Sequence, residues 1–228
     1  MTSQPVNTPP PDHVMVLGGQ GWIGLVDHMG AEVSIVNAAR VSFGKQRSTM
    51  AERDIALLRY LVEHRHTSPL EHVVFTFVVH CPLFVRSQWH RHRTWSYNEI
   101  SRRYTSIDME FYTPPQVREQ ADTDRQASTE PRTLDQHACR TLIADHNRTS
   151  LQLYNHLVDA GVCREQARGV LPQNMMTTFW ATVDLNNLIA FLDLRDSEHA
   201  QWEIRQYARA IKQLLRPLLP NVATVLNW

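Results

Sequence analysis

The residues VVFTFVV, from Val73 to Val79, are all β-branched or aromatic and give the strongest strand signal in the chain. Before them, Thr49 and Glu52 form a capping-box pair, and apolar side chains between Ile55 and Val62 recur at helical spacing. Pro69 ends this helix, because proline lacks the N–H that helical pairing needs. The stretch therefore predicts a central strand that follows closely after a helix.

The rest of the chain reads as long helices that alternate with a few strands. We expect two or three strands within Val14–Val36 and another at Met175–Val183. The expected helices are Leu83–Arg93, Leu134–Ala160, Arg164–Val170, Asn186–Leu194 and Glu198–Leu215. This order predicts an α/β or α+β fold in which helices cover a central sheet, and it leaves the strand directions open.

The chain is expected to form a single domain over residues 14–228, after a flexible N-terminus at residues 1–13. Between residues 113 and 133 lie Pro114, Pro115 and Pro131, with almost no large apolar side chains. This composition predicts a mobile loop that takes no part in the chemistry.

Composition limits the partners of the protein. Its 228 residues include 23 basic and 23 acidic side chains, which argues against the pervasive positive field that non-specific nucleic-acid binding needs. Only Lys45 and Lys212 are lysines, and arginine forks match phosphate and carboxylate groups. No apolar run reaches the roughly 18 residues of a membrane span. The three cysteines are too few for a disulfide framework, so we expect a cytoplasmic protein.

Three patterns resemble other kinds of site, and the context of each argues against it. Gly19, Gly21 and Gly24 spell the dinucleotide fingerprint G-x-G-x-x-G, but no clean helix follows to receive a pyrophosphate. The clustered histidines lack the spacing of a zinc site, so no metal is expected. The G-x-S-x-G elbow of a serine hydrolase is absent from the sequence.

The segment Gln88–Tyr104 carries the densest polar chemistry, with arginines, histidines, amides, serines and Glu99 interleaved with aromatic residues. A solvated loop with incidental salt bridges is the simplest explanation of such a run. However, Trp89, Trp95 and the apolar residues before them imply that the segment is anchored to a core. Arginine forks, amides and aromatic faces together favour a surface that binds phosphate and a heterocyclic ring.

Arg91-His92-Arg93, followed by seven residues and then Ser101, matches the R-H-R-x7-S signature of the flavin-dependent thymidylate synthases. Tyr97-Asn98-Glu99 and Arg103-Tyr104 extend the match. The other segments that resemble this family are Ala38–Phe43, Ser68–Phe77, Ala167–Pro172, Phe191–Arg195 and His199–Ile204. The resemblance spans about Leu25 to Leu215.

The resemblance implies an enzyme that makes dTMP from dUMP, with a methylene from methylenetetrahydrofolate and hydride from NADPH through FAD. In this family the sites are assembled between subunits of a homotetramer. The implied dUMP site comprises Gln88, Trp89, His90, Arg91, Glu99, Ile100, Ser101, Arg102, Arg103, Arg168 and Arg195. The implied FAD contacts are Ser68, Arg91, His92, Arg93, Glu99, Asp184, Asn186 and Ala190.

Arg195 matches the family arginine credited with favouring ionisation at uracil N3, and it is the expected catalytic residue because a guanidinium stabilises a developing anion. Ser101 has no evident activating base, so hydrogen bonding to the nucleotide is favoured over nucleophilic attack. Asp184 and Ala190 depart from the family pattern at positions that touch FAD in relatives. An acidic Asp184 near a phosphate would be unfavourable, and Asn186 and Asn187 are candidates to compensate.

Two other functions stay open at this point. One is flavin-dependent C5 modification of a different pyrimidine nucleotide, and the other is nucleotide binding without catalysis. Bound flavin would reject the second, and a comparison of dUMP with dCMP as substrates would separate the first from thymidylate synthesis.

Overall fold

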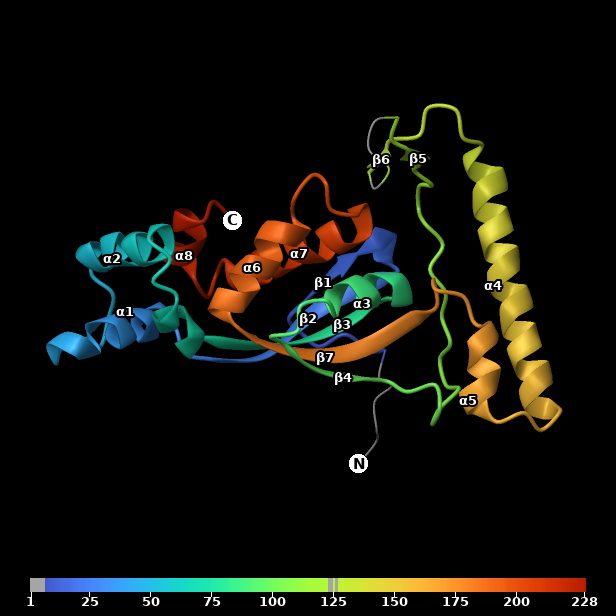
Figure 1. Cartoon of the computed structure of the whole chain (residues 1–228), viewed down its shortest axis with the longest axis horizontal. Helices are drawn as coiled ribbons and strands as arrows, with labels where there is room; N and C mark the ends of the chain where they lie inside the picture. Colours follow the sequence, from blue (N-terminus) through green and yellow to red (C-terminus); the bar gives the residue numbers. More distant parts are fainter. Residues whose placement is uncertain (1–6, 123–124, 126) are drawn as a thin grey trace.

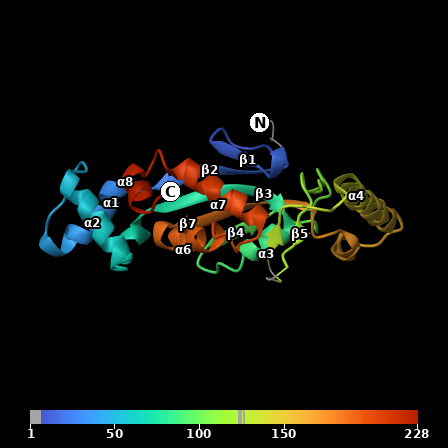
Figure 2. The ribbon, with the colours of Figure 1, turned by 90° about the horizontal axis from the view of Figure 1, so that it is seen from above.

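The computed structural model describes residues 7–122, 125 and 127–228, and it shows a five-stranded sheet with helices against one face (Figures 1 and 2). The strand order is β1-β2-β3-β7-β4, and every pair is antiparallel. These strands are β1 His13–Val16, β2 Gly21–Met29, β3 Val74–Pro82, β4 Ser96–Glu99 and β7 Met176–Asp184. The α+β prediction is confirmed, and the strand directions that the sequence left open are antiparallel.

Three helices, α3, α6 and α7, lie over the sheet, whereas α1, α2 and α8 gather at one end and α4 stands beside α5 at the other (Figure 1). The helices are α1 Glu32–Arg40, α2 Glu52–Glu63, α3 Leu83–Trp89, α4 Gln136–Asp159, α5 Arg164–Ala167, α6 Leu185–Arg195, α7 Trp202–Leu215 and α8 Pro220–Val225. The short 3-10 turns are η1 Leu17–Gly19, η2 Val41–Phe43, η3 Ser68–His72 and η4 Arg168–Val170.

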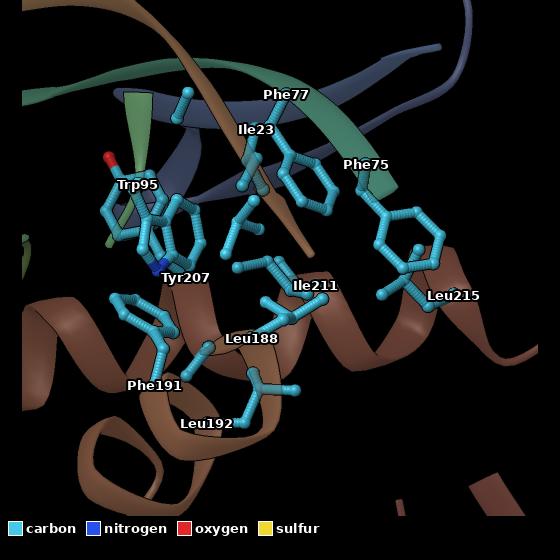
Figure 3. Packing of buried hydrophobic residues seen from close by; sticks show 14 of the residues in the cluster. Ile23, Phe75, Phe77, Trp95, Leu188, Phe191, Leu192, Tyr207, Ile211 and Leu215 are labelled. Atoms are coloured by element: carbon cyan, nitrogen blue, oxygen red, sulfur yellow. The ribbon is translucent and has the colours of Figure 1, made fainter. Parts of the chain in front are cut away.

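The central strand is β3, as VVFTFVV predicts, and its side chains alternate between the two faces of the sheet. Val79 pairs with Ile23 of β2 and with Phe179 of β7, and all three are fully buried. Figure 3 shows Phe77 on the same face, above Ile211 of α7. The side chains on one face of the sheet therefore pack against the helices and form the hydrophobic core with them.

Helix α3 is anchored to this core by Val85 and Trp89, which lie one turn apart and are fully buried. The Trp89 indole lies 4.7 Å from the Phe191 ring of α6, 5.6 Å from Phe179 and 5.9 Å from Tyr207, between ring centroids. The expected helix Leu83–Arg93 was too long, because α3 ends at Trp89. The signature arginines therefore lie in the loop that follows the helix.

Two further expectations about secondary structure were wrong. Glu32–Val36 begins α1 instead of continuing the strands, because the Ser34 hydroxyl accepts the Ala31 N–H and starts a helix. Helix α8 was not expected, since Pro217 and Pro220 read as terminators of the preceding helix; Pro220 instead occupies the first turn of α8, where its missing N–H costs nothing.

The glycines of the G-x-G-x-x-G pattern have structural roles in the turn between β1 and β2 and in strand β2. Gly19, at φ +85°, lies in the turn between β1 and β2. A Cβ at Gly21 would lie 2.1 Å from the Tyr207 hydroxyl, which donates a hydrogen bond to the His80 carbonyl at 2.7 Å. The pattern leads into a strand and not into a helix N-terminus.

The segment expected to be a mobile loop contains a hairpin of β5 Glu119–Gln120 and β6 Ser128–Thr129. Backbone N–H groups of Thr133 and Arg132 donate to the Glu119 carboxylate and lower its pKa to about 2. The mobility of residues 113–133 stays a prediction.

The expected flexible N-terminus falls partly outside the described residues, which begin at residue 7. In the described part, the Thr178 hydroxyl donates to Asn7 Oδ1 at 2.9 Å, and His13 begins β1. Residues 7–13 therefore lie against the sheet.

Glu32 holds the start of α8. Its Oε1 accepts the N–H groups of Asn221 and Val222 at 2.7 and 2.8 Å, and only 5% of the residue is exposed.

We expect Glu32→Ala to lower the free energy of unfolding by about 2 kcal/mol, because it leaves part-buried donors without an acceptor. Glu32→Gln keeps one carbonyl oxygen and should cost less. Urea unfolding measures both variants, and unchanged stability of Glu32→Ala would contradict this role.

Candidate active site

Helices α3 and α6 meet at Arg195, the last residue of α6. Arg195 lies one helical turn after Phe191, whose ring packs against Trp89, so its side chain reaches the end of α3. There Arg195 Nε donates to His92 Nε2 at 3.0 Å, and Nη2 donates to the Gln88 carbonyl at 3.2 Å. Burial lowers the pKa of the guanidinium. These two hydrogen bonds fix the orientation of the guanidinium plane, and neither of them involves Nη1.

His92 must be neutral to accept this hydrogen bond, with its proton on Nδ1. Its ring lies edge-on to Phe191, with the centroids 4.8 Å apart. Burial, followed by the Arg195 charge, lowers the pKa of His92 to about 4. The second residue of the signature therefore acts here as a support for Arg195.

The first cavity, of about 520 Å³, has Arg195 and Gln88 in its wall. Gln88 Nε2 donates to Gln201 Oε1, and Gln201 Nε2 donates to Glu203 at 2.9 Å. The wall is completed by Glu198, His199, Ala200 and Arg205 near the start of α7 and by Pro114, Gln116, Val117, Arg118, Gln120, Ala127 and Ser128. The segment in which we expected no chemistry thus forms one side of this cavity.

A second cavity, of about 560 Å³, contains most of the other residues expected to bind dUMP. It is lined by Glu99, Ile100, Ser101, Arg102 and Arg168, with Leu83, Arg86, Glu165, Gly169, Leu171, Gln173, Met175 and Thr177. The Thr177 hydroxyl donates to Glu99 at 2.7 Å, and Arg86 lies 3.2 Å from the same oxygen. Nearby, Arg103 pairs with Glu165 at 2.9 Å. Three arginines and two glutamates line this cavity, which leaves a small excess of positive charge that suits an anion.

A third cavity, of about 380 Å³, includes Asn186 and Ala190, two of the expected FAD contacts. Arg65 and Thr67 add polar groups, and Ser68 follows Thr67 in the chain. The other lining residues are Val62, Leu70, Ile189, Asp193 and Leu226. Apolar walls with a few donors fit a planar heterocycle such as one ring system of FAD.

The first two cavities share no lining residue in the described part of the chain. Helix α3 separates them: Arg86 lines the second and Gln88 lines the first. Residues two apart on a helix point in nearly opposite directions, at 100° per residue. The residues expected to bind dUMP are therefore divided between two separate cavities of the chain.

Comparison with known proteins identifies the family of the chain. Residues 24–221 match the family model described as "Thymidylate synthase complementing protein". The chain belongs to the flavin-dependent thymidylate synthase family. The flavin-dependent thymidylate synthase of Thermus thermophilus is 49% identical over 201 residues, covering 88% of this chain and 73% of the relative. That of Thermosipho africanus is 45% identical over 203 residues and covers 88% of both chains.

Solved structures agree with this family membership. The UMP/dUMP methylase PolB from Streptomyces cacaoi, bound with 5-Br UMP, superposes with a TM-score of 0.80 at 30% identity. That match covers 98% of this chain and 97% of PolB. PolB bound with 5-Br dUMP gives a TM-score of 0.82 at 29% identity, covering 96% of both chains.

Not every expected contact faces a cavity of this thymidylate synthase family member. Trp89 is fully buried in the core and lines none of the three cavities, and its expected role in binding the nucleotide stays a prediction. His90 stacks on Tyr97, with centroids 4.2 Å apart, and lines none of the three cavities. Arg91 and Arg93 are exposed on the loop after α3.

Asp184, which was expected to touch FAD, stabilises the start of α6. Its carboxylate caps α6, accepting the Asn187 N–H at 3.0 Å and the Asn187 side-chain amide at 2.6 Å. The charge that would oppose a phosphate is thus engaged at a helix start, where it is favourable. Asn187 is occupied by this contact, whereas Asn186 lines the third cavity and donates from Nδ2 to Glu71 Oε1 at 3.2 Å.

Sequence reasoning missed Gln201, Glu203 and Arg118 as residues of the site. Gln201 and Glu203 lie in the segment His199–Ile204, which resembles the family, but the resemblance assigned no function to either residue. Arg118 lies in a Pro-rich segment whose composition gave no sign that it would wall a cavity.

None of the three cysteines, all of which the structure describes, lines any of the three cavities. Cys81 is fully buried on β3, and burial raises the pKa of its thiol. In the residues that the structure describes, no His, Cys, Asp and Glu side chains cluster as metal ligands, and none of their helices is long and apolar enough to span a membrane.

We expect His92 to stay neutral well below pH 6.5. Because its pKa in the folded protein is lowered to about 4, its stabilising contribution is complete above pH 6.5 and is lost as the pH falls toward 4. ¹⁵N NMR of histidine-labelled protein, assigned by loss of the signal in His92→Gln, should show unprotonated Nε2 at pH 6. A midpoint near pH 6.5 would contradict the Arg195 contact.

Proposed function

We propose that this enzyme converts dUMP to dTMP, with methylenetetrahydrofolate as carbon donor and NADPH as reductant through FAD. The observation that carries the proposal is the Arg195 guanidinium, held by His92 and Gln88 at the wall of the first cavity. A fixed donor set of this kind stabilises negative charge on a uracil ring while C5 forms its bond.

The second cavity supplies the phosphate end of the nucleotide site. Arg103 and Arg168 offer forks to the phosphate, and Ser101 contributes a hydroxyl donor. Arg102 is 5% exposed and already donates to the Ile107 and Asp108 carbonyls, so it supports the loop more than it reaches a ligand. The uracil analogues bound to PolB support a pyrimidine monophosphate as the occupant.

FAD would lie with one ring system in the third cavity, where Arg65, Thr67 and Asn186 offer hydrogen bonds. The exposed Arg91 and Arg93 are suited to its pyrophosphate. When bound, flavin supplies hydride-transfer chemistry that no amino-acid side chain provides.

We propose a homotetramer in which the first cavity of one protomer meets the second cavity of another. The separation of the two half-sites by α3 supports this arrangement, because a single nucleotide needs groups from both. The proposed setting is the cytoplasm, which suits the free cysteines Cys81, Cys139 and Cys163.

Activity assays on the purified protein decide between these functions. We expect the protein to carry flavin and to form dTMP from dUMP only when NADPH and methylenetetrahydrofolate are both present. Parallel assays with UMP and dCMP test modification of other pyrimidine nucleotides. A protein that binds nucleotide but neither flavin nor folate would contradict the proposal.

We expect Arg195→Ala to keep flavin bound while kcat falls at least about a hundredfold, because charge stabilisation in the transition state is lost. Flavin absorbance and steady-state kinetics measure the two effects separately. Arg209→Ala is the matched control, since it removes an exposed arginine from α7 outside the three cavities. An unchanged kcat for Arg195→Ala would refute the catalytic role.

A further inference from the structure

The side chains of Glu203, Gln201 and Gln88 form a hydrogen-bonded chain with only one possible direction. A carboxylate can only accept, and Glu203 accepts from the Tyr112 hydroxyl at 3.4 Å and from Gln201 Nε2 at 2.9 Å. Gln201 therefore turns its nitrogen to Glu203 and its oxygen to Gln88. Gln88 must then donate through Nε2 to that oxygen.

This direction decides which end of the Gln88 carboxamide a ligand meets. With Nε2 engaged, Oε1 is the remaining polar atom, and none of the described residues donates a hydrogen bond to it. Gln88 lines the first cavity together with Arg195. The wall thus presents an acceptor, Gln88 Oε1, close to the donors of the guanidinium.

We propose that the Glu203–Gln201 pair fixes Gln88 as an acceptor for the N3–H of uracil and so excludes cytosine nucleotides; this specificity rests on the proposed function. Uracil carries a hydrogen at N3 between two carbonyl oxygens, to either of which Arg195 can donate. Cytosine has a bare lone pair at N3, which would face the Gln88 oxygen as a second acceptor. Two opposed acceptors leave both without a partner, and that is costly in a part-buried site.

The pair also defines the protonation state in which the nucleotide binds. An acceptor at N3 stabilises the neutral imide, so the ground-state complex keeps the N3 proton. Gln201 and Glu203 are positioning residues in this scheme, because they act only through Gln88.

Glu203→Gln tests the direction of the chain with almost no change of shape. The amide of the new glutamine can also donate, so the hydrogen bonds between residues 203, 201 and 88 can all reverse direction. Gln88 Nε2 would then face the ligand. We expect dUMP affinity to fall about threefold to tenfold and the preference for dUMP over dCMP to shrink by at least about tenfold. Calorimetric titration of the flavin-loaded protein with each nucleotide measures both. Glu63→Gln is the matched control: it removes one exposed carboxylate at the end of α2, outside the three cavities, and should change neither.

The Gln88→Leu background separates positioning from a general structural effect. If Glu203 acts only through Gln88, Glu203→Gln adds nothing to Gln88→Leu; a full additional loss would overturn the inference. Gln201 provides a second variant should Glu203→Gln fold poorly. Gln201→Leu removes the acceptor of Gln88 Nε2 and should lose the dUMP preference.

The outcomes for the inference and for the proposed function are distinct. Wild-type protein without thymidylate synthase activity would contradict the function. An active wild type whose dUMP preference survives both Glu203→Gln and Gln201→Leu would contradict the inference alone.

Discussion

The site depends on the packing of one buried side chain, the indole of Trp89. It ties the end of α3 to the sheet through Phe179 and to α6 through Phe191, and it is fully buried. Removing a side chain of this size from a core typically costs about 3–5 kcal/mol. Since Arg195 follows Phe191 by one turn, the packing that fixes α3 also delivers the guanidinium to His92.

The same anchoring explains why the expected nucleotide site is divided. With Val85 and Trp89 held in the core, the two flanks of α3 must face different sides, and they present Arg86 and Gln88 to separate cavities. Three arginines and two glutamates line each cavity, and the first also contains the hydrogen-bonded amides of Gln88 and Gln201, which end at Glu203. Under the proposed function, phosphate binding and base recognition would fall to these two different surfaces of one chain.

Much of this could be predicted from the sequence, where local chemistry is decisive. The run Val73–Val79 predicted the central strand, and the signature Arg91–Ser101 predicted the family, which the comparisons show. The antiparallel order could not be predicted, because strand pairing depends on contacts far apart in the chain. Helix α8 escaped prediction for the same reason: its start is capped by Glu32, almost 190 residues earlier.

The division of the site was equally hidden. Trp89 belongs to the signature region and reads as a ligand contact until its burial is known, and Asp184 reads as a misplaced charge until its capping of α6 is seen. The hairpin residues near Arg118 carry no pattern that predicts a cavity wall. In each case the role follows from which residues meet in space, and spacing along the chain does not contain that information.

The central claim, that the two halves of the site come from different protomers, is tested most directly by mixing two inactive variants. Arg195→Ala disables the first cavity and Arg168→Ala disables the second. Each variant alone should be inactive, whereas equal co-expression should restore roughly a quarter of wild-type activity, since random pairing leaves that share of sites with both halves intact. Mixed assemblies that stay as inactive as the separate variants would show that each site is built within one chain.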